Sequence, residues 1–258
     1  MSRVVITGVG MITPLANTAE ETWKAFLQGK SGTSRLSQID PAPFNSKVGA
    51  EVKNFDPIKF ISSRKAHTMG RFSQFAVAAA KLACEDAHLQ ITRESSEKIN
   101  VCFGTTSNGA ADIYEEGHVT FLNRGSEHIP TTTIVEYAAH AAASHVAIEL
   151  GIKGQAFTLS AGCTTGLDVV QWGTAQIQSG KTHLVVVGAS DALISPYIVG
   201  AFCALGILSK RNEAPKTISR PYDLSHDGMV LAEGAGAVIL EDLDYALERN
   251  AEIYAEVL

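Results

Sequence analysis

The sequence predicts an α/β protein with a mostly parallel central sheet. Strand-like and helix-like segments alternate along the chain, which is the order that right-handed crossovers between parallel strands produce. The strand-like runs, such as residues 184–187, are apolar throughout, as is typical of strands covered on both faces. The 258 residues are 45% hydrophobic and 19% charged, enough to build one large core or two packed subdomains.

The first strand is expected over residues 4–7, closed by a tight turn at Gly8 and Gly10. These glycines superficially resemble a dinucleotide-binding fingerprint. However, the third glycine is missing, Pro14 stands where the helix would begin, and no acidic residue follows at the distance that ribose binding requires. The sequence therefore indicates a structural turn and not a nucleotide site.

Two helix starts carry capping boxes, because Thr18 and Thr133 are each followed three residues later by glutamate. Prolines and polar turn residues make residues 31–63 irregular. Expected helices span residues 18–28, 70–88, 133–150, 164–178 and 196–205.

The later strands follow apolar runs, and the run at residues 155–159 is predicted to be buried. The last eight residues alternate like a strand and stop without a polar tail, so we expect the chain either to be cut there or to lean on another polypeptide. Expected strands after the first span residues 99–105, 155–159, 183–188, 235–241 and 251–258.

Composition argues against several classes of function. The net charge of −6 gives no basic footprint for nucleic acid. No apolar run is long enough to cross a bilayer and no signal peptide is evident, so we expect a cytoplasmic protein with no membrane partner. Neither the 4 cysteines nor the 8 histidines have metal-ligand spacing, so we expect reduced thiols, no metal and no cofactor.

Cys163 is the strongest candidate for a reactive group. It stands between the strand-like run at residues 155–159 and the helix at residues 164–178. A thiol at a helix start lies at the positive end of the helix dipole, beside unpaired N–H groups that favour a thiolate and an anionic intermediate. The alternative is a buried cysteine that acts as a small hydrophobe. The neighbouring Gly162 and Thr164 favour the nucleophile.

A second dense block of charges and glycines occupies residues 219–236, just before a strand. We interpret it first as an ion-paired turn that positions the strand. Buried charges need partners, so Arg220, Asp227 and Glu233 are also expected to form one network behind the site.

Three segments together resemble a β-ketoacyl-acyl-carrier-protein synthase: residues 5–10 (VITGVG), residues 160–166 (SAGCTTG) and the block at residues 219–236. The wording around Cys163 is similar to the condensing subunits of type II polyketide synthases, with fatty-acid elongation enzymes of the FabF kind as the near alternative. The resemblance implies a thiolase-like layered fold, of which residues 1–258 are the N-terminal half.

The resemblance also implies roles for individual residues. Cys163 would be the catalytic residue that accepts an acyl group from a carrier phosphopantetheine, and a decarboxylated malonyl group would then attack it. Its backbone N–H would supply half of an oxyanion hole. Asn108, Ile198 and Phe202 would bind the acyl chain; Asn108 either favours a polar or short acyl group or simply makes a local turn bond.

Arg64, Lys65 and Arg71 form a local basic cluster that either docks an acidic acyl carrier protein or is a solvated face. The histidines and lysine that assist condensation in the family belong to the second half, and no histidine here matches those motifs. We therefore expect a second polypeptide or segment to supply the C-terminal half, and a homodimer or heterodimer. The alternatives are a non-catalytic acyl-binding or partner-stabilising subunit and a thiolase-type acyltransferase.

Overall fold

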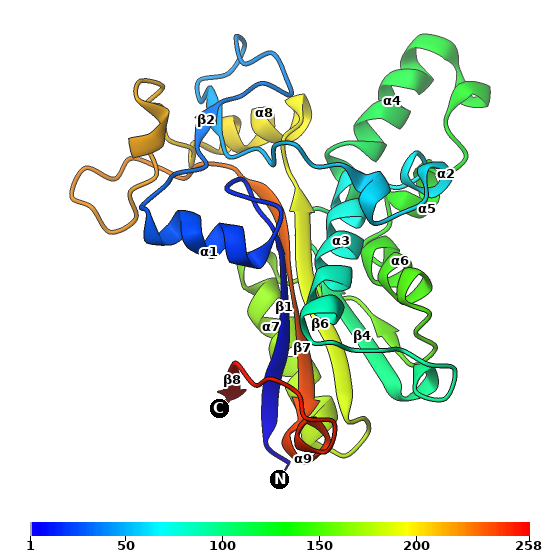
Figure 1. Ribbon diagram of the computed structural model, residues 1–258. Helices are drawn as coiled ribbons and strands as arrows, with labels where there is room; N and C mark the ends of the chain where they lie inside the picture. The colour runs from blue at the N-terminus through cyan, green and yellow to red at the C-terminus, as the bar shows by residue number, and fades with distance from the viewer. Residues whose placement is uncertain (1) are drawn as a thin grey trace.

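A six-stranded sheet with helices on both faces forms the centre of the molecule, as the computed structural model shows for residues 2–258 (Figure 1). The strand order is β5-β4-β6-β7-β1-β8. A separate two-stranded sheet, β2 (Ser34–Arg35) with β3 (Val48–Gly49), lies in the segment expected to be irregular. The strands of the main sheet are β1 (Val4–Ile12), β4 (Ile99–Gly104), β5 (Ala156–Phe157), β6 (Leu184–Ala192), β7 (Glu233–Asp242) and β8 (Ala255–Val257).

The helices that the sequence predicts fall close to their expected positions, but α2, α4 and α9 were not predicted, and one expected helix is divided. The expected helix over residues 133–150 is two helices, because Thr133 forms no side-chain cap and the chain turns again before Ala141. The helices are α1 (Ala19–Leu27), α2 (Ser63–Ala66), α3 (Arg71–Asp86), α4 (Ile113–Arg124), α5 (Thr133–Glu136), α6 (Ala141–Leu150), α7 (Thr165–Gln178), α8 (Pro196–Leu205) and α9 (Leu243–Glu248).

Tertiary contacts override the second capping box. The Glu136 side chain is buried and turns inward, where it accepts a hydrogen bond from Gly70 N and contacts the His145 ring. A carboxylate that serves the start of α3 cannot also cap its own helix. By contrast, the first capping box behaves as predicted, since Thr18 Oγ1 accepts from Glu21 N at 3.2 Å.

The sheet is mixed, which is a more precise description than the mostly parallel sheet that the sequence predicts. β5, β4 and β6 pair in parallel, whereas β7 pairs antiparallel with both β6 and β1. The pairings make β1, β4, β5 and β6 point the same way, with β7 and β8 running against them. Continuous apolar runs report burial on both faces, not strand direction, so the sequence could not reveal the reversed β7.

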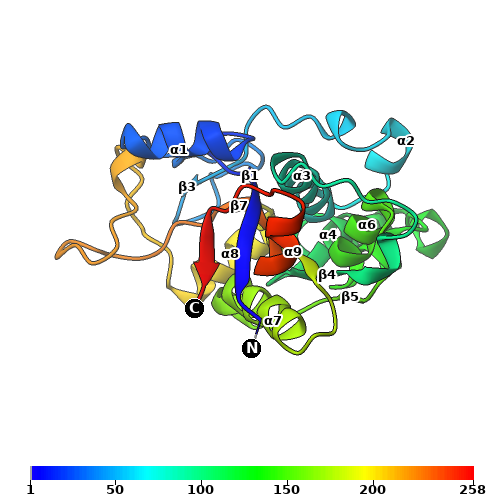
Figure 2. The same cartoon turned by 60° about the horizontal axis from the view of Figure 1, so that its bottom comes forward.

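Alternate residues of the strands fill two cores. Val101 and Val186 face α3 and α6, whereas Cys102 and Val187 face α7, and all four are fully buried. Figure 2 shows these helices on either side of the sheet, viewed towards its end. This two-sided burial confirms the prediction drawn from residues 184–187.

The prediction of a turn at Gly8 and Gly10 is wrong, because β1 continues through both to Ile12. The glycines instead allow α3 to lie directly on the strand. A Cβ at Gly10 would collide with the carbonyl oxygen of Ala79, and one at Gly8 with that of Ala83. The two glycines do indicate a structural constraint, but that constraint is close helix–sheet packing and not a turn.

The strand before Cys163 is not buried, contrary to the prediction. β5 spans only two residues, both exposed, and among residues 2–258 it pairs only with β4. Its Phe157 stacks on Trp172 of α7, with ring centroids 5.5 Å apart. β5 is therefore an edge strand of the sheet.

Within residues 2–258, none of the helices is long and apolar enough to span a membrane.

Candidate active site

Cys163 lies on a tight turn between β5 and α7. Residues Gly162–Thr164 form a single 3₁₀ turn that leads directly into the 14-residue helix α7. Gly162 adopts φ +66°, in the left-handed region that glycine tolerates best. Cys163 is exposed at this helix start, as predicted, where backbone N–H groups and the helix dipole favour an anion. We call residues 161–165 the nucleophile turn, after the role that the sequence predicts for Cys163.

Hydroxyl groups hold the nucleophile turn in place. Thr165 Oγ1 accepts from Ala161 N at 2.8 Å and donates to the Gly162 carbonyl oxygen at 2.7 Å. Thr164 Oγ1 donates to the Asp168 carboxylate at 2.9 Å. Thr165 is itself buried, against the end of β4 at Gly104, where a Cβ would collide with the Thr165 methyl group. The turn is therefore fixed from inside, while its cysteine stays open to solvent.

The other cysteines lie in different environments. Cys84 and Cys102 are buried, and this burial raises the pKa of each thiol to about 12. Cys203 on α8 is half-buried. Cys163 is the only exposed cysteine among the residues that the structure describes, so it is the thiol that a large substrate could reach.

The loop after β4 touches the nucleophile turn. Thr106 Oγ1 donates to the Gly162 carbonyl oxygen at 3.3 Å, and the Asp191 carboxylate at the end of β6 accepts from Thr106 N at 3.0 Å. Neither Thr106 nor Asp191 was singled out from the sequence. The available signal was their position, since both lie at the carboxyl ends of neighbouring parallel strands, where sites in open α/β sheets form.

The structure brings one of the three predicted acyl-binding residues to this loop. Asn108 has φ +48°, its N–H donates to Thr105 Oγ1 at 2.9 Å, and its buried Oδ1 has no partner among residues 2–258. Ile198 is buried on α8, and Phe202 of the same helix packs in an apolar cluster with Val199. That cluster does not include the nucleophile turn.

The three residues of the predicted basic cluster lie in different environments. Arg64 on α2 is exposed, and Lys65 is half exposed with an ion pair to Glu149 at 2.5 Å. Arg71, in contrast, turns inward, where its guanidinium binds both carboxylate oxygens of Glu233, at 2.8 and 2.9 Å. An arginine that neutralises a buried carboxylate is not free to bind a partner protein. Arg71 is therefore not part of the docking cluster.

The expected network of Arg220, Asp227 and Glu233 does not form. Arg220 donates to Ser225 Oγ at 2.9 Å, within its own loop. Asp227 accepts from Ser209 Oγ at 2.9 Å, and Glu233 pairs with Arg71. The segment between α8 and β7 loops away from the sheet (Figure 1), so Arg220 and Asp227 find their partners within that segment, whereas Glu233 begins β7 beside Arg71. The block thus supplies local turn bonds and one end of a buried ion pair.

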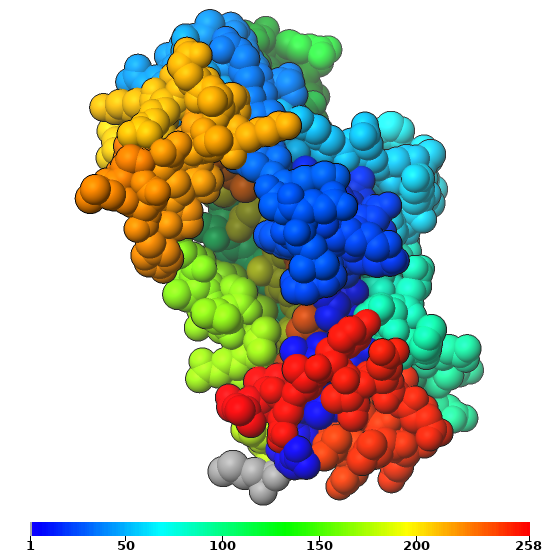
Figure 3. All heavy atoms as spheres, turned by 60° about the vertical axis from the view of Figure 1, so that its left-hand side comes forward, coloured from blue at the N-terminus to red at the C-terminus, as the bar shows by residue number. Residues whose placement is uncertain are grey.

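The surface is hollowed near these elements. One hollow of about 250 Å³ lies between α7 and the strands β1, β6 and β7, and its lining includes Gly166 and Val170. Figure 3 shows this face, with a recess between α1 in blue and the orange segment that precedes β7. The start of α7 therefore borders an open, largely apolar recess.

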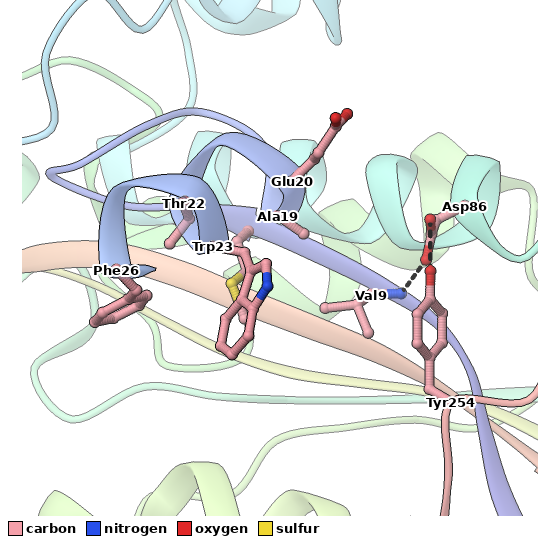
Figure 4. Close-up of a pocket in the computed structure, with 9 residues that line it drawn as sticks. Val9, Ala19, Glu20, Thr22, Trp23, Phe26, Asp86 and Tyr254 are labelled. Carbon is pink, nitrogen blue, oxygen red and sulfur yellow. Dashed lines mark hydrogen bonds between the residues drawn. The ribbon is translucent and has the colours of Figure 1, made fainter. Parts of the chain in front are cut away.

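A larger apolar pocket of about 620 Å³ lies between α1, β1 and Tyr254, and Cys163 is not among its lining residues. Trp23 and Phe26 of α1 line it (Figure 4). At its far end Asp86 accepts hydrogen bonds from Val9 N at 2.8 Å and from the Tyr254 hydroxyl at 3.1 Å. This pocket is therefore separate from the residues that the sequence singles out, and its lining contains no cysteine.

The sequence has named relatives along nearly its whole length. It is 34% identical over 256 residues to 3-oxoacyl-[acyl-carrier-protein] synthase 2 of Vibrio harveyi, covering 99% of this chain and 61% of that protein. The protein of the same name from Staphylococcus aureus strain COL is 32% identical, with the same coverage. The chain thus spans about 61% of the length of these relatives.

Solved structures agree. A β-ketoacyl synthase from Burkholderia phymatum superposes with a TM-score of 0.88 at 29% identity, over 99% of this chain and 63% of that one. The ishigamide ketosynthase/chain length factor gives a TM-score of 0.89 at 30% identity, over 100% and 62%.

A type II polyketide ketosynthase, solved in complex with its acyl carrier protein and bound to a hexaketide, gives a TM-score of 0.85 at 31% identity. It covers 99% of this chain and 62% of that one. These likenesses confirm the predicted thiolase-like α/β fold. The family model for the β-ketoacyl synthase N-terminal domain matches residues 1–246, and the chain belongs to this family.

Proposed function

We propose that residues 1–258 are the N-terminal domain of a β-ketoacyl-acyl-carrier-protein synthase, and that Cys163 accepts the acyl group. One observation carries the proposal: an exposed thiol stands at the start of α7, on a turn that buried Thr165 holds rigid. Preorganised N–H donors at that place suit the oxyanion of acyl transfer. The four free cysteines, Cys163 included, also fit a reducing compartment such as the cytoplasm.

The chemistry has two steps. First, Cys163 loses its thiol proton and the thiolate attacks the carbonyl carbon of a carrier-bound acyl thioester; the tetrahedral oxyanion collapses, the carbon–sulfur bond to the carrier breaks, and the departing carrier thiolate takes up a proton in place of the one that Cys163 lost. Second, a malonyl thioester loses carbon dioxide, and the resulting carbanion attacks the acyl group on Cys163. The new carbon–carbon bond forms as the carbon–sulfur bond breaks, and the Cys163 thiolate is released.

The partner is an acyl carrier protein, as in the type II polyketide complex among the similar structures. Arg64 and the exposed part of Lys65 offer positive charge to an acidic carrier. Arg71 does not, because it is paired with Glu233. We place Asn108, Ile198 and Phe202 along the acyl chain, as the family resemblance implies. The buried, unpartnered Oδ1 of Asn108 supports a polar feature in that path.

Condensation needs more than this domain. The curated relatives are longer than these 258 residues, and the family resemblance places the decarboxylating histidines in the additional part. We propose that a C-terminal half, on the same or a second polypeptide, completes the site. Dimerisation with a second synthase subunit is part of this proposal, and the exposed edge strand β5 is compatible with it.

Intact mass spectrometry tests the proposal. The 258-residue polypeptide, incubated with acyl-loaded carrier protein, should gain the mass of one acyl group, and Cys163→Ala should gain none. Addition of malonyl-carrier should give no β-ketoacyl product, because the family resemblance places the decarboxylating histidines outside these 258 residues. An acyl group found on another residue, or equal acylation of Cys163→Ala, would contradict the assignment.

A further inference from the structure

One carboxylate ties the loop after β4 to the end of β6. Hydrogen-bonded pairing of these strands ends at Gly104. Beyond it, Asp191 accepts from the backbone N–H groups of Thr106 at 3.0 Å and Ser107 at 3.1 Å. It also accepts from Thr105 Oγ1 at 2.9 Å and Ser107 Oγ at 3.2 Å. The Asp191 side chain therefore continues the strand pairing where backbone partners end.

The same loop reaches the peptide group that carries the nucleophile's N–H. The Gly162 carbonyl oxygen accepts from both Thr106 Oγ1 at 3.3 Å and Thr165 Oγ1 at 2.7 Å. This carbonyl and the N–H of Cys163 belong to one planar peptide unit. The Thr165 N–H also donates to this carbonyl, and together with the two hydroxyls it fixes the direction of the Cys163 N–H. They also polarise the unit and strengthen the N–H as a donor.

We propose that Asp191 and Thr106 are positioning residues that aim the Cys163 N–H at the oxyanion formed during acyl transfer. The proposal rests on the proposed function, because it takes Cys163 as the acyl acceptor. Asp191 holds the backbone of Thr106, and the Thr106 hydroxyl holds the Gly162–Cys163 peptide. Each residue acts through the next one along this path.

The surroundings of the two residues favour this role over a purely structural one. Thr106 is exposed and Asp191 is only half-buried, at the rim of an open hollow, so neither contributes much to the apolar core. The core anchor of the nucleophile turn is already present in buried Thr165. What Thr106 adds is a second hydroxyl on the one carbonyl that is rigidly coupled to the Cys163 N–H.

Two reactions of Cys163 separate positioning from folding. Acyl transfer passes through a tetrahedral oxyanion, whereas alkylation by iodoacetamide displaces iodide without one. We expect Thr106→Val and Asp191→Asn to slow acylation by acyl-loaded carrier protein about 10- to 100-fold, since oxyanion donors lose effect when misaimed. Alkylation of Cys163 should stay unchanged, and Thr106→Ser should restore acylation because it keeps the hydroxyl.

A readout independent of activity completes the test. Labelling with ¹⁵N-cysteine gives one amide signal for each cysteine, and Cys163→Ser identifies the signal of Cys163. We expect Thr106→Val and Asp191→Asn to shift the Cys163 signal while those of Cys84 and Cys203 stay in place. An unshifted Cys163 signal, unchanged acylation, or acylation and alkylation falling together would overturn the positioning role.

The proposed function fails in a different way. If the unmodified chain takes up no acyl group, Cys163 is not an acceptor in this polypeptide. The ¹⁵N signal of Cys163 then still decides whether Thr106 and Asp191 orient its peptide group.

Discussion

Arg71 and Glu233 form a bidentate ion pair that joins the start of α3 to the start of β7. Glu233 is 4% exposed, and its carboxylate also accepts from Val52 N at 2.8 Å. The pair explains why Arg71, which the sequence places in a surface cluster, instead serves as the partner of a buried carboxylate.

Loss of one partner should therefore destabilise the protein. Arg71→Met leaves the Glu233 carboxylate buried without its cation, and such changes cost about 3–5 kcal/mol. Urea unfolding followed by circular dichroism measures the free energy of unfolding. Arg64→Met, on an exposed residue, is the matched control and should change it little; equal effects of both variants would contradict the buried pair.

Carrier docking should depend on Arg64 more than on Lys65, because Lys65 is already paired with Glu149. We expect Arg64→Glu to weaken binding of an acidic carrier protein severalfold, more so at low salt than at high salt. Fluorescence anisotropy of labelled carrier protein measures this at two ionic strengths. Lys30→Glu, remote in sequence from this cluster, serves as the charge-matched control, and equal weakening by it would contradict a local docking site.

Alkylation should be selective for Cys163. In the native protein, iodoacetamide should modify Cys163 first, whereas Cys84 and Cys102 should stay unmodified at neutral pH. Burial raises the pKa of the latter two to about 12, so their thiolates form only as the pH approaches that value. Peptide mapping after brief alkylation at increasing pH reads this directly. Early labelling of Cys84 would show that the core is open.

Thr165 should matter for both stability and acyl transfer. Thr165→Val removes a buried hydroxyl that accepts from Ala161 N and donates to Gly162 O, at a cost of about 1–3 kcal/mol. Acylation of Cys163 should slow at the same time, because the nucleophile turn loosens. Thr165→Ser keeps the hydroxyl and should retain most of the stability and most of the acylation rate. Thermal unfolding measures the stability, and intact mass measures the acylation.

Gly10→Ala tests the reinterpretation of the first glycines. The new methyl group would meet the Ala79 carbonyl of α3, so strand and helix must separate, at a cost of about 1–3 kcal/mol. Gly236→Ala, on β7 with open space at its Cβ position, is the matched control. Similar melting temperatures for both variants would favour the turn that the sequence suggested.

Local patterns predicted most strands of the main sheet and five helical segments, but they missed α2, α4, α9 and the small sheet of β2 and β3, and they did not reveal long-range partners. The cysteine at the start of α7 could be found because strand, glycine and helix signals meet at Cys163. Arg71 was misassigned because its partner Glu233 lies 162 positions away in the sequence. Asp191 went unnoticed for the same reason, since its four donor groups come from a loop far earlier in the chain. Sequence patterns indicate burial and helix starts, but they do not indicate which charged residues pair in the folded protein.

Strand β7 carries a glutamate near each end, and each is buried with an arginine. Glu233 binds Arg71, and Glu241 binds Arg249 at 2.8 Å while also contacting the Thr7 hydroxyl. A shift of β7 by two residues against β6 would move both carboxylates away from their arginines. The two ion pairs therefore stabilise one register of β7. That register sets Gly234 opposite Asp191. The two ion pairs of β7 thus help to set the place of Asp191, the carboxylate that organises the loop beside Cys163.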